Sequence, residues 1–282
     1  MQPIVNLIID GFIGVITRIA DDITNFVTGV MVTIMGDAIK LLDARFVINA
    51  ILLAQTVAGS LLALKIAVEA LKAFMLYSNG EATNPGELLK RSAISAALIG
   101  SGPWIVKYVY QFGTSLAYDV ANLAGADAKN LLDVIHNGVS STIITPIIII
   151  VAFIIFLLVY MQMFVRSAEL VVLAVTGPIM AIDMRPTGGG LTAIWWRELL
   201  IISMSQPLQI FLIKCALLAA TFLNSADPIE KLCLTIAFLW LAYKSPSVIK
   251  QYTYNSGVGG AIGGAAQQAG TMVIMRKMMT RV

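Results

Sequence analysis

The sequence has few charged residues and very little cysteine or histidine. Only 12% of its 282 residues are charged, against about a quarter in soluble domains. Apolar residues make up 58% of the chain and the mean hydropathy is +0.85, which is too apolar for a disordered protein. The two cysteines, Cys215 and Cys233, lie inside apolar runs, which excludes a disulfide scaffold. We therefore predict an all-α integral membrane protein.

No pattern typical of an enzyme active site is present. The single histidine, His136, has no second His or Cys at the spacing of metal ligands. Three glycines at 188–190 follow Pro186, but no lysine or hydroxyl residue follows them at the spacing of a phosphate-binding loop. We interpret them as a flexible turn. We expect neither enzymatic activity nor a metal or cofactor.

Five stretches are apolar enough to predict transmembrane helices, each of which needs about 20 largely apolar residues. The clearest lies in a run without any charge from Asn137 to Val165. The first stretch continues as a helix beyond its apolar part, through Lys65, Glu69 and Lys72. The predicted spans cover about 46–64, 92–118, 143–165, 195–223 and 229–243.

Two further segments are ambiguous. Residues 3–42, within an N-terminal region 1–45, have the pattern of an amphipathic helix in which acidic residues and Arg18 interrupt any span. We expect this region to lie at the membrane interface or against a partner, outside the cytoplasm. Residues 167–183 are apolar but short, and Pro178 indicates a continuation, a bend or a re-entrant segment, of which we favour the last two.

The distribution of Lys and Arg predicts an orientation, because positively charged loops stay in the cytoplasm. If the C-terminus lies inside, the inner segments 65–91, 166–198 and 244–282 hold 12 of the 19 Lys and Arg residues. The outer segments hold 5. We therefore expect the N-terminus outside and the C-terminus inside.

Charged residues in or beside the spans are the most informative, because they are costly in lipid. Lys65 and Glu69 are four positions apart and Arg166 and Glu169 are three apart, so each pair can form along one helix face. Lys107 and Lys214 lie inside spans and have no acidic residue within four positions. Their side chains either extend to the membrane interface, line a pore or bridge helices. The candidate pore-lining or interhelix residues are Lys65, Glu69, Lys107, Gln206, Gln209 and Lys214.

Aromatic residues and prolines also mark the spans. Four aromatic residues near span ends, Trp195, Trp196, Trp240 and Tyr243, are predicted to anchor helices at the membrane interface. Pro103, Pro178 and Pro207 fall inside helical stretches, where transporters use the freed backbone carbonyls at binding sites. No inverted repeat relates the three prolines, which counts against a carrier.

Residues 244–282 are predicted to form a Gly/Ala-rich, basic cytoplasmic tail. Two GxxxG spacings suit close packing of small residues. The basic residues at the end are expected to meet anionic lipid headgroups, with an acidic partner or nucleic acid as alternatives. The tail residues concerned are Gly259, Gly260, Gly263, Gly264, Arg276, Lys277 and Arg281.

The order of these features resembles a known family. An amphipathic start, a weakly hydrophobic helix and one very apolar span are followed by Arg166-x-x-Glu169 and an apolar run to Pro178. A glycine-rich connection, a span with Gln206 and Gln209 in its middle, a short last span and the small-residue tail complete the order. The chain resembles the TrbL-type polytopic channel subunits of type IV secretion and conjugation machines, especially the compact versions of Gram-positive bacteria.

This resemblance implies a non-enzymatic component of the cytoplasmic membrane of a prokaryote, in which Arg166, Glu169 and Pro178 match the family's pattern. Several copies would form a platform in a larger complex with secretion ATPases and other small membrane subunits. Single-stranded DNA bound to a relaxase, or protein cargo, would pass through the assembly. A small secondary transporter or permease subunit is the main alternative, and a scaffold or pore-forming protein is the third.

Overall fold

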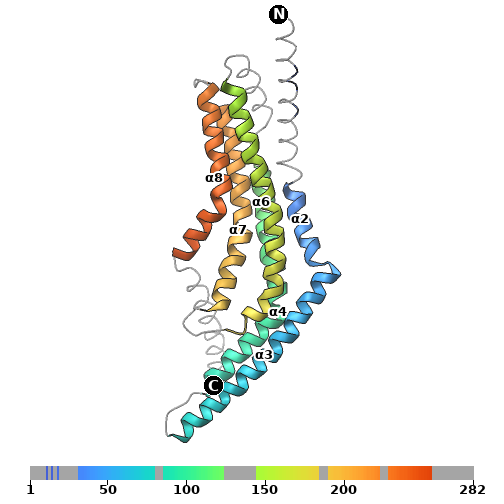
Figure 1. Ribbon diagram of the computed structural model, residues 1–282, viewed down its shortest axis with the longest axis vertical. Helices are drawn as coiled ribbons and strands as arrows, with labels where there is room; N and C mark the ends of the chain where they lie inside the picture. Colours follow the sequence, from blue (N-terminus) through green and yellow to red (C-terminus); the bar gives the residue numbers. More distant parts are fainter. Residues whose placement is uncertain are drawn as a thin grey trace, which may run out of the picture. The chain divides into compact units, whose positions relative to one another are not determined.

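The computed structural model describes residues 31–79, 85–123, 144–183, 190–222 and 228–255, together with Gly11, Gly14 and Arg18 (Figure 1). Within these ranges the secondary structure is helical and no strand occurs, which confirms the predicted all-α fold. The helices are α2 (Met31–Leu42), α3 (Arg45–Ser78), α4 (Pro85–Ala121), α6 (Ile144–Met180), α7 (Leu191–Phe222) and α8 (Pro228–Asn255).

Among the described residues, four helices are long and apolar enough to cross a membrane, and they overlap four of the five predicted spans. The remaining predicted span, 92–118, is helical and lies within α4, but it does not reach the hydropathy of the other four. Gly100, Ser101, Gly102 and Lys107 dilute its apolar residues. A crossing by α4 stays a prediction. The four apolar segments are Arg45–Ser78, Ile150–Met180, Leu191–Ala219 and Ile229–Tyr254.

Two helices extend further than the sequence led us to expect. α6 continues to Met180 with Pro178 inside it, so residues 167–180 prolong the third predicted span and form no separate re-entrant element. α8 likewise passes through Pro246, where we predicted the last span to stop, and ends at Asn255. Proline removes only one backbone donor from a helix, and side chains of neighbouring helices can replace it.

The chain divides into two compact units, and every described helix except α3 contributes residues to both. Unit 1 comprises Met1–Ala38, Gln111–Ala168 and Ser203–Val248, and unit 2 comprises Ile39–Tyr110, Glu169–Ile202 and Ile249–Val282.

Each unit has its own apolar core. The core of unit 1 draws on α2, α4, α6, α7 and α8, and Met35, Val159 and Ile213 are almost completely buried in it. Unit 2 has a smaller core, in which Ala58 and Ile99 belong to the paired helices α3 and α4, drawn side by side in Figure 1. Burial of these side chains supplies the packing that positions the polar groups described next.

Candidate functional site

A group of polar side chains on α7 lies inside unit 1. Ser203, Ser205, Gln206 and Gln209 are each at most 2% exposed, although they occupy the middle of a helix apolar enough to span a membrane. Burying polar atoms without hydrogen-bond partners costs free energy, so such groups are normally held by neighbouring helices. Within this chain, the two glutamines that we singled out therefore pack between helices.

Gln209 links α7 to both α6 and α8. Its side-chain amide Nε2 donates to Oε1 of Gln162 at 3.0 Å and to the backbone carbonyl of Ala242 at 3.2 Å. The amide of Gln162 in turn donates to the carbonyl of Tyr243 at 3.1 Å. Ser245 donates its hydroxyl to the carbonyl of Ala242 as well, at 2.9 Å. Side chains from three helices thus meet at two consecutive carbonyls of α8.

Pro246 explains why the carbonyl of Ala242 receives side-chain donors. In an α-helix the carbonyl of residue i−4 accepts the N–H of residue i, so the partner of the Ala242 carbonyl would be the N–H of residue 246. Proline has no N–H, and its ring crowds that carbonyl. Gln209 of α7 and Ser245 of α8 donate to this carbonyl instead, and α8 continues through the proline.

The same arrangement recurs in unit 2. Pro103 lies inside α4 and leaves the carbonyl of Ile99 without its helical donor. The side-chain amide of Gln55 on α3 donates to this carbonyl at 3.0 Å and to that of Gly100 at 3.2 Å. From the sequence we expected Gln55 to line a wet path or meet a neighbouring subunit, and we did not single out Gln162. The contact of Gln55 was not predictable, because the donor and the proline that requires it lie on different helices.

Pro207 on α7 frees a third carbonyl, that of Ser203, and here the neighbour is a backbone. A Cβ added to Gly113 of α4 would lie 2.3 Å from the carbonyl oxygen of Ser203 and 2.9 Å from its carbon. Real Cβ atoms do not approach backbone atoms so closely, so only glycine permits this contact. Gly113 is a key residue that the sequence alone did not indicate.

Near Pro178, a backbone carbonyl of α6 receives a hydrogen bond from the indole ring of Trp195. Trp195 donates its Nε1–H to the carbonyl of Leu173 at 3.0 Å and is 4% exposed. Gly177 lies against the same ring, since a Cβ at that position would be 3.0 Å from Nε1. The prediction that Trp195 is an interfacial anchor is therefore wrong, because the side chain packs between α6 and α7 inside unit 2.

Arg166 is a buried charge, with 4% of the residue exposed. Its guanidinium donates to the hydroxyl of Ser205 on α7, within unit 1. Hydrogen bonds from a neighbouring helix are what a buried arginine in a membrane protein requires. The predicted pairing of Arg166 with Glu169 stays a prediction, and Glu169 is exposed.

The three lysines that we singled out have partners. In unit 2, Lys107 lies 2.7 and 2.8 Å from the two carboxylate oxygens of Asp43. In unit 1, Lys214 donates to the carbonyl of Leu123, just beyond the end of α4, at 3.1 Å. In unit 2, Lys65 contacts the carbonyl of Ile182, which lies just beyond the end of α6. The carbonyls at a helix C-terminus lack helical donors and carry partial negative charge, so a cation stabilises them.

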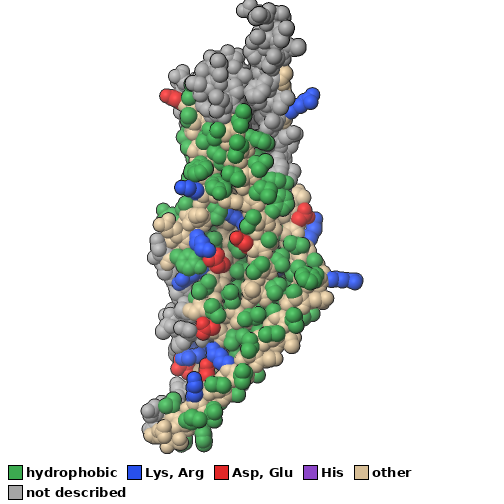
Figure 2. All heavy atoms as spheres, in the orientation of Figure 1, with side chains coloured by type: hydrophobic (Ala, Val, Ile, Leu, Met, Phe, Trp, Pro, Cys, Tyr) green, Lys and Arg blue, Asp and Glu red, His purple; other side chains and the backbone are tan. Residues whose placement is uncertain are grey.

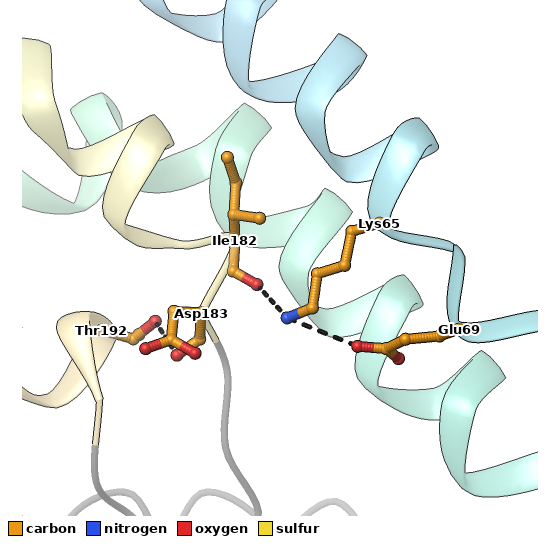
Figure 3. Close-up of polar contacts among 5 residues, drawn as sticks. All are labelled: Lys65, Glu69, Ile182, Asp183 and Thr192. Atoms are coloured by element: carbon orange, nitrogen blue, oxygen red, sulfur yellow. Dashed lines mark hydrogen bonds and ion pairs between the residues drawn. The ribbon is translucent and has the colours of Figure 1, made fainter. Parts of the chain in front are cut away.

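The connection between α6 and α7 in unit 2 shows this third lysine (Figure 3). Lys65 of α3 donates to the carbonyl of Ile182 at 2.8 Å and lies 3.9 Å from Glu69, which confirms the predicted pair. On the other side, Thr192 donates to the carbonyl of Met180 at 2.8 Å. The carboxylate of Asp183 accepts a hydrogen bond from the backbone N–H of Leu191, the first residue of α7, at 3.3 Å. A negative charge at the N-terminus of a helix interacts favourably with the helix dipole.

Lys65→Met tests this C-terminal cap. Removing the charge should lower the free energy of unfolding by about 1 kcal/mol, because the carbonyl beyond α6 loses its donor and its favourable charge. Thermal unfolding in mild detergent, followed by tryptophan fluorescence, measures the shift. Lys72→Met, an exposed lysine on the same helix, is the matched control and should leave the midpoint unchanged. Equal shifts in both variants would contradict a capping role.

α7 and α8 carry a second polar cluster in unit 2. Glu198 lies 2.9 Å from Nζ of Lys250 and accepts the phenolic hydroxyl of Tyr254 at 2.8 Å. The guanidinium of Arg197 lies over the ring of Tyr254, 5.5 Å from its centroid, at the distance of a cation–π contact. Adjacent Arg197 and Glu198 thus both find partners on α8, in the part of that helix beyond its predicted end.

These contacts hold helices together, and within the described residues no group of three or more His, Cys, Asp or Glu side chains could hold a metal ion. His136 lies outside the described residues. So do the tail residues Gly259, Gly260, Gly263, Gly264, Arg276, Lys277 and Arg281.

The chain is similar to a known protein family. A family model described as conjugal transfer protein TrbL matches residues 1–281 of this chain. No curated protein and no solved structure matches it. The match extends over almost the whole chain, so all the residues that make the contacts described above lie within the matched region.

Proposed function

We propose that this chain, which belongs to the TrbL family of conjugal transfer proteins, is a non-enzymatic platform subunit of a membrane channel. Membership of the family makes it a component of a conjugal transfer, or type IV secretion, apparatus, and its four apolar helices make it a multi-pass membrane protein. Several copies would assemble in the cytoplasmic membrane, with the N-terminus outside and the C-terminus inside.

The observation that carries the platform role is the burial of polar groups within the spans. Arg166, Gln206 and Gln209 are each at most 4% exposed and lie between helices of the same chain. A polar conduit through one chain would leave such groups open to water. Their burial supports a passage formed between copies of the chain, or between the chain and other subunits.

The energy and the cargo would come from outside the chain. Secretion ATPases would drive transfer, and other small membrane subunits would complete the complex. The cargo would be single-stranded DNA attached to a relaxase, or protein. The role of this chain would be to hold the helices that surround the path.

Deletion of the coding sequence from a transfer-proficient donor tests the proposal. We expect DNA transfer to recipients to fall to the level of a donor that lacks the secretion ATPase, because the membrane platform would be missing. A plasmid copy of the intact chain should restore transfer. Unchanged transfer, together with solute uptake into proteoliposomes by the purified chain alone, would favour the secondary transporter.

A further inference from the structure

The paired helices α3 and α4 are longer than a bilayer requires. α3 has 34 residues and α4 has 37, which correspond to about 51 and 55 Å at the rise of an α-helix. The hydrocarbon core of a membrane is about 30 Å thick. The apolar run of α3 from Phe46 to Leu64 is long enough to fill it. The rest of α3, from Lys65 to Ser78, therefore extends beyond the hydrocarbon.

The first turns of α4 accompany this extension. Gln55 of α3 contacts the carbonyls of Ile99 and Gly100, and Asp43 pairs with Lys107, so the two helices run antiparallel. In this register residues 86–91 of α4 lie beside about residues 64–69 of α3, and the last turns of α3 extend beyond the start of α4. We call residues 71–78 and 86–91 the hairpin tip, and all of it belongs to unit 2.

The hairpin tip, which lies beyond the predicted span 46–64, exposes large apolar side chains. Figure 2 shows hydrophobic side chains along the surface of this hairpin. Phe74, Tyr77 and Leu89 are 68%, 74% and 75% exposed, and Leu71, Met75 and Leu76 are at least 42% exposed. Contiguous apolar surface in water marks a site of protein–protein contact.

The charges around the hairpin tip indicate the sign of the charge expected on the surface of its partner. Residues 65–91 hold four basic and three acidic residues, and one of the acidic ones, Glu81, lies outside the described residues. Glu69 pairs with Lys65, and Glu87 pairs with Arg91. Lys72 and Lys90 are the basic residues that have no acidic partner within the described part of the chain. Complementary charge at the rim of an interface steers association and selects partners.

We propose that the hairpin tip docks a cytoplasmic protein whose apolar groove is rimmed by acidic side chains. The inference rests on the proposed function and on the orientation that places residues 65–91 in the cytoplasm. The exposed apolar side chains fill the groove, and Lys72 and Lys90 contact its rim. A second copy of this chain is the less suitable occupant, because two such tips would bring like charges together.

Site-specific photo-crosslinking in native donor membranes tests the docking surface. A benzophenone side chain replaces Phe74 in one strain and, as the matched control, Phe46, which is 83% exposed but lies in the span. We expect a covalent adduct from position 74 with another protein, mapped by mass spectrometry to an acidic segment. The adduct should disappear in a Lys72→Glu, Lys90→Glu background. Position 46 should give no such adduct.

Other outcomes would overturn the proposal: an adduct with a second copy, an adduct with lipid alone, no adduct, or one that survives charge reversal. A second readout separates this proposal from the proposed function. Phe74→Ser with Tyr77→Ser should abolish DNA transfer while the chain keeps its membrane abundance and its size on native electrophoresis. If deleting the whole chain leaves transfer unchanged, the proposed function fails, whereas a charge-dependent adduct would still support the docking surface.

Discussion

Gly113→Ala is expected to prevent unit 1 from packing as described. The new Cβ would lie 2.3 Å from the carbonyl oxygen of Ser203 and within 3.2 Å of two further backbone atoms of that residue. A flexible side chain could move aside, but here two helix backbones would have to separate. Overpacking of this kind typically costs about 1–3 kcal/mol, and backbone contacts belong at the upper end. Marginally stable proteins tolerate few such losses.

Thermal unfolding in mild detergent and the amount of protein in membranes measure this effect. Gly59→Ala is the matched control, because it makes the same substitution inside an apolar helix where nothing lies within 4 Å of the added Cβ. Alanine is a better helix former than glycine by about 1 kcal/mol, so the control should be neutral or stabilising. Equal stability of the two variants would contradict the close approach of α4 to α7.

Gln209→Leu is expected to have the next largest effect. The substitution keeps a side chain of similar size but removes the donors to Gln162 and to the carbonyl of Ala242. Ser245 still donates to the carbonyl of Ala242 in this variant, so the acceptor that loses its donor is Oε1 of Gln162. A buried acceptor left without a donor costs about 1–3 kcal/mol in soluble proteins, and less on average between membrane helices, so we expect a loss of about 2 kcal/mol in the free energy of unfolding. Reversible denaturation in bicelles measures it.

A double-mutant cycle with Pro246→Ala identifies the cause of that loss. Alanine at position 246 restores a backbone N–H for the carbonyl of Ala242, so Gln209 has one acceptor fewer to satisfy. The cost of Gln209→Leu should therefore be smaller in the Pro246→Ala background than in the native chain. The same cost in both backgrounds would show that the glutamine acts independently of the proline.

The fold class and the four apolar spans were predictable because hydrophobicity is a property of each segment. A run of about 20 apolar residues forms a helix in lipid whichever neighbours it has. The Lys65–Glu69 pair was predictable for a similar reason, since residues four apart on a helix lie on one face. Membership of the TrbL family also followed from the order of segments along the chain.

The ends of helices and the partners of polar groups were less predictable. α8 passes Pro246, although a proline beside a lysine and a serine suggested an end. Trp195 is buried, although tryptophans near span ends are usually found at the membrane interface. In both cases a distant segment supplies what the local pattern lacks: a glutamine amide for the freed carbonyl, and a packed helix for the indole.

The sequence by itself determined that this protein is a bundle of membrane-spanning helices, and it identified the polar residues and prolines that interrupt those helices. Only the tertiary structure decided what each interruption contacts. Lys107 pairs with Asp43, 64 positions away, and Gln209 reaches a carbonyl 33 positions away. The physical reason is that composition and periodicity act within one helix, whereas a freed carbonyl or a buried charge is satisfied by whichever helix packs beside it.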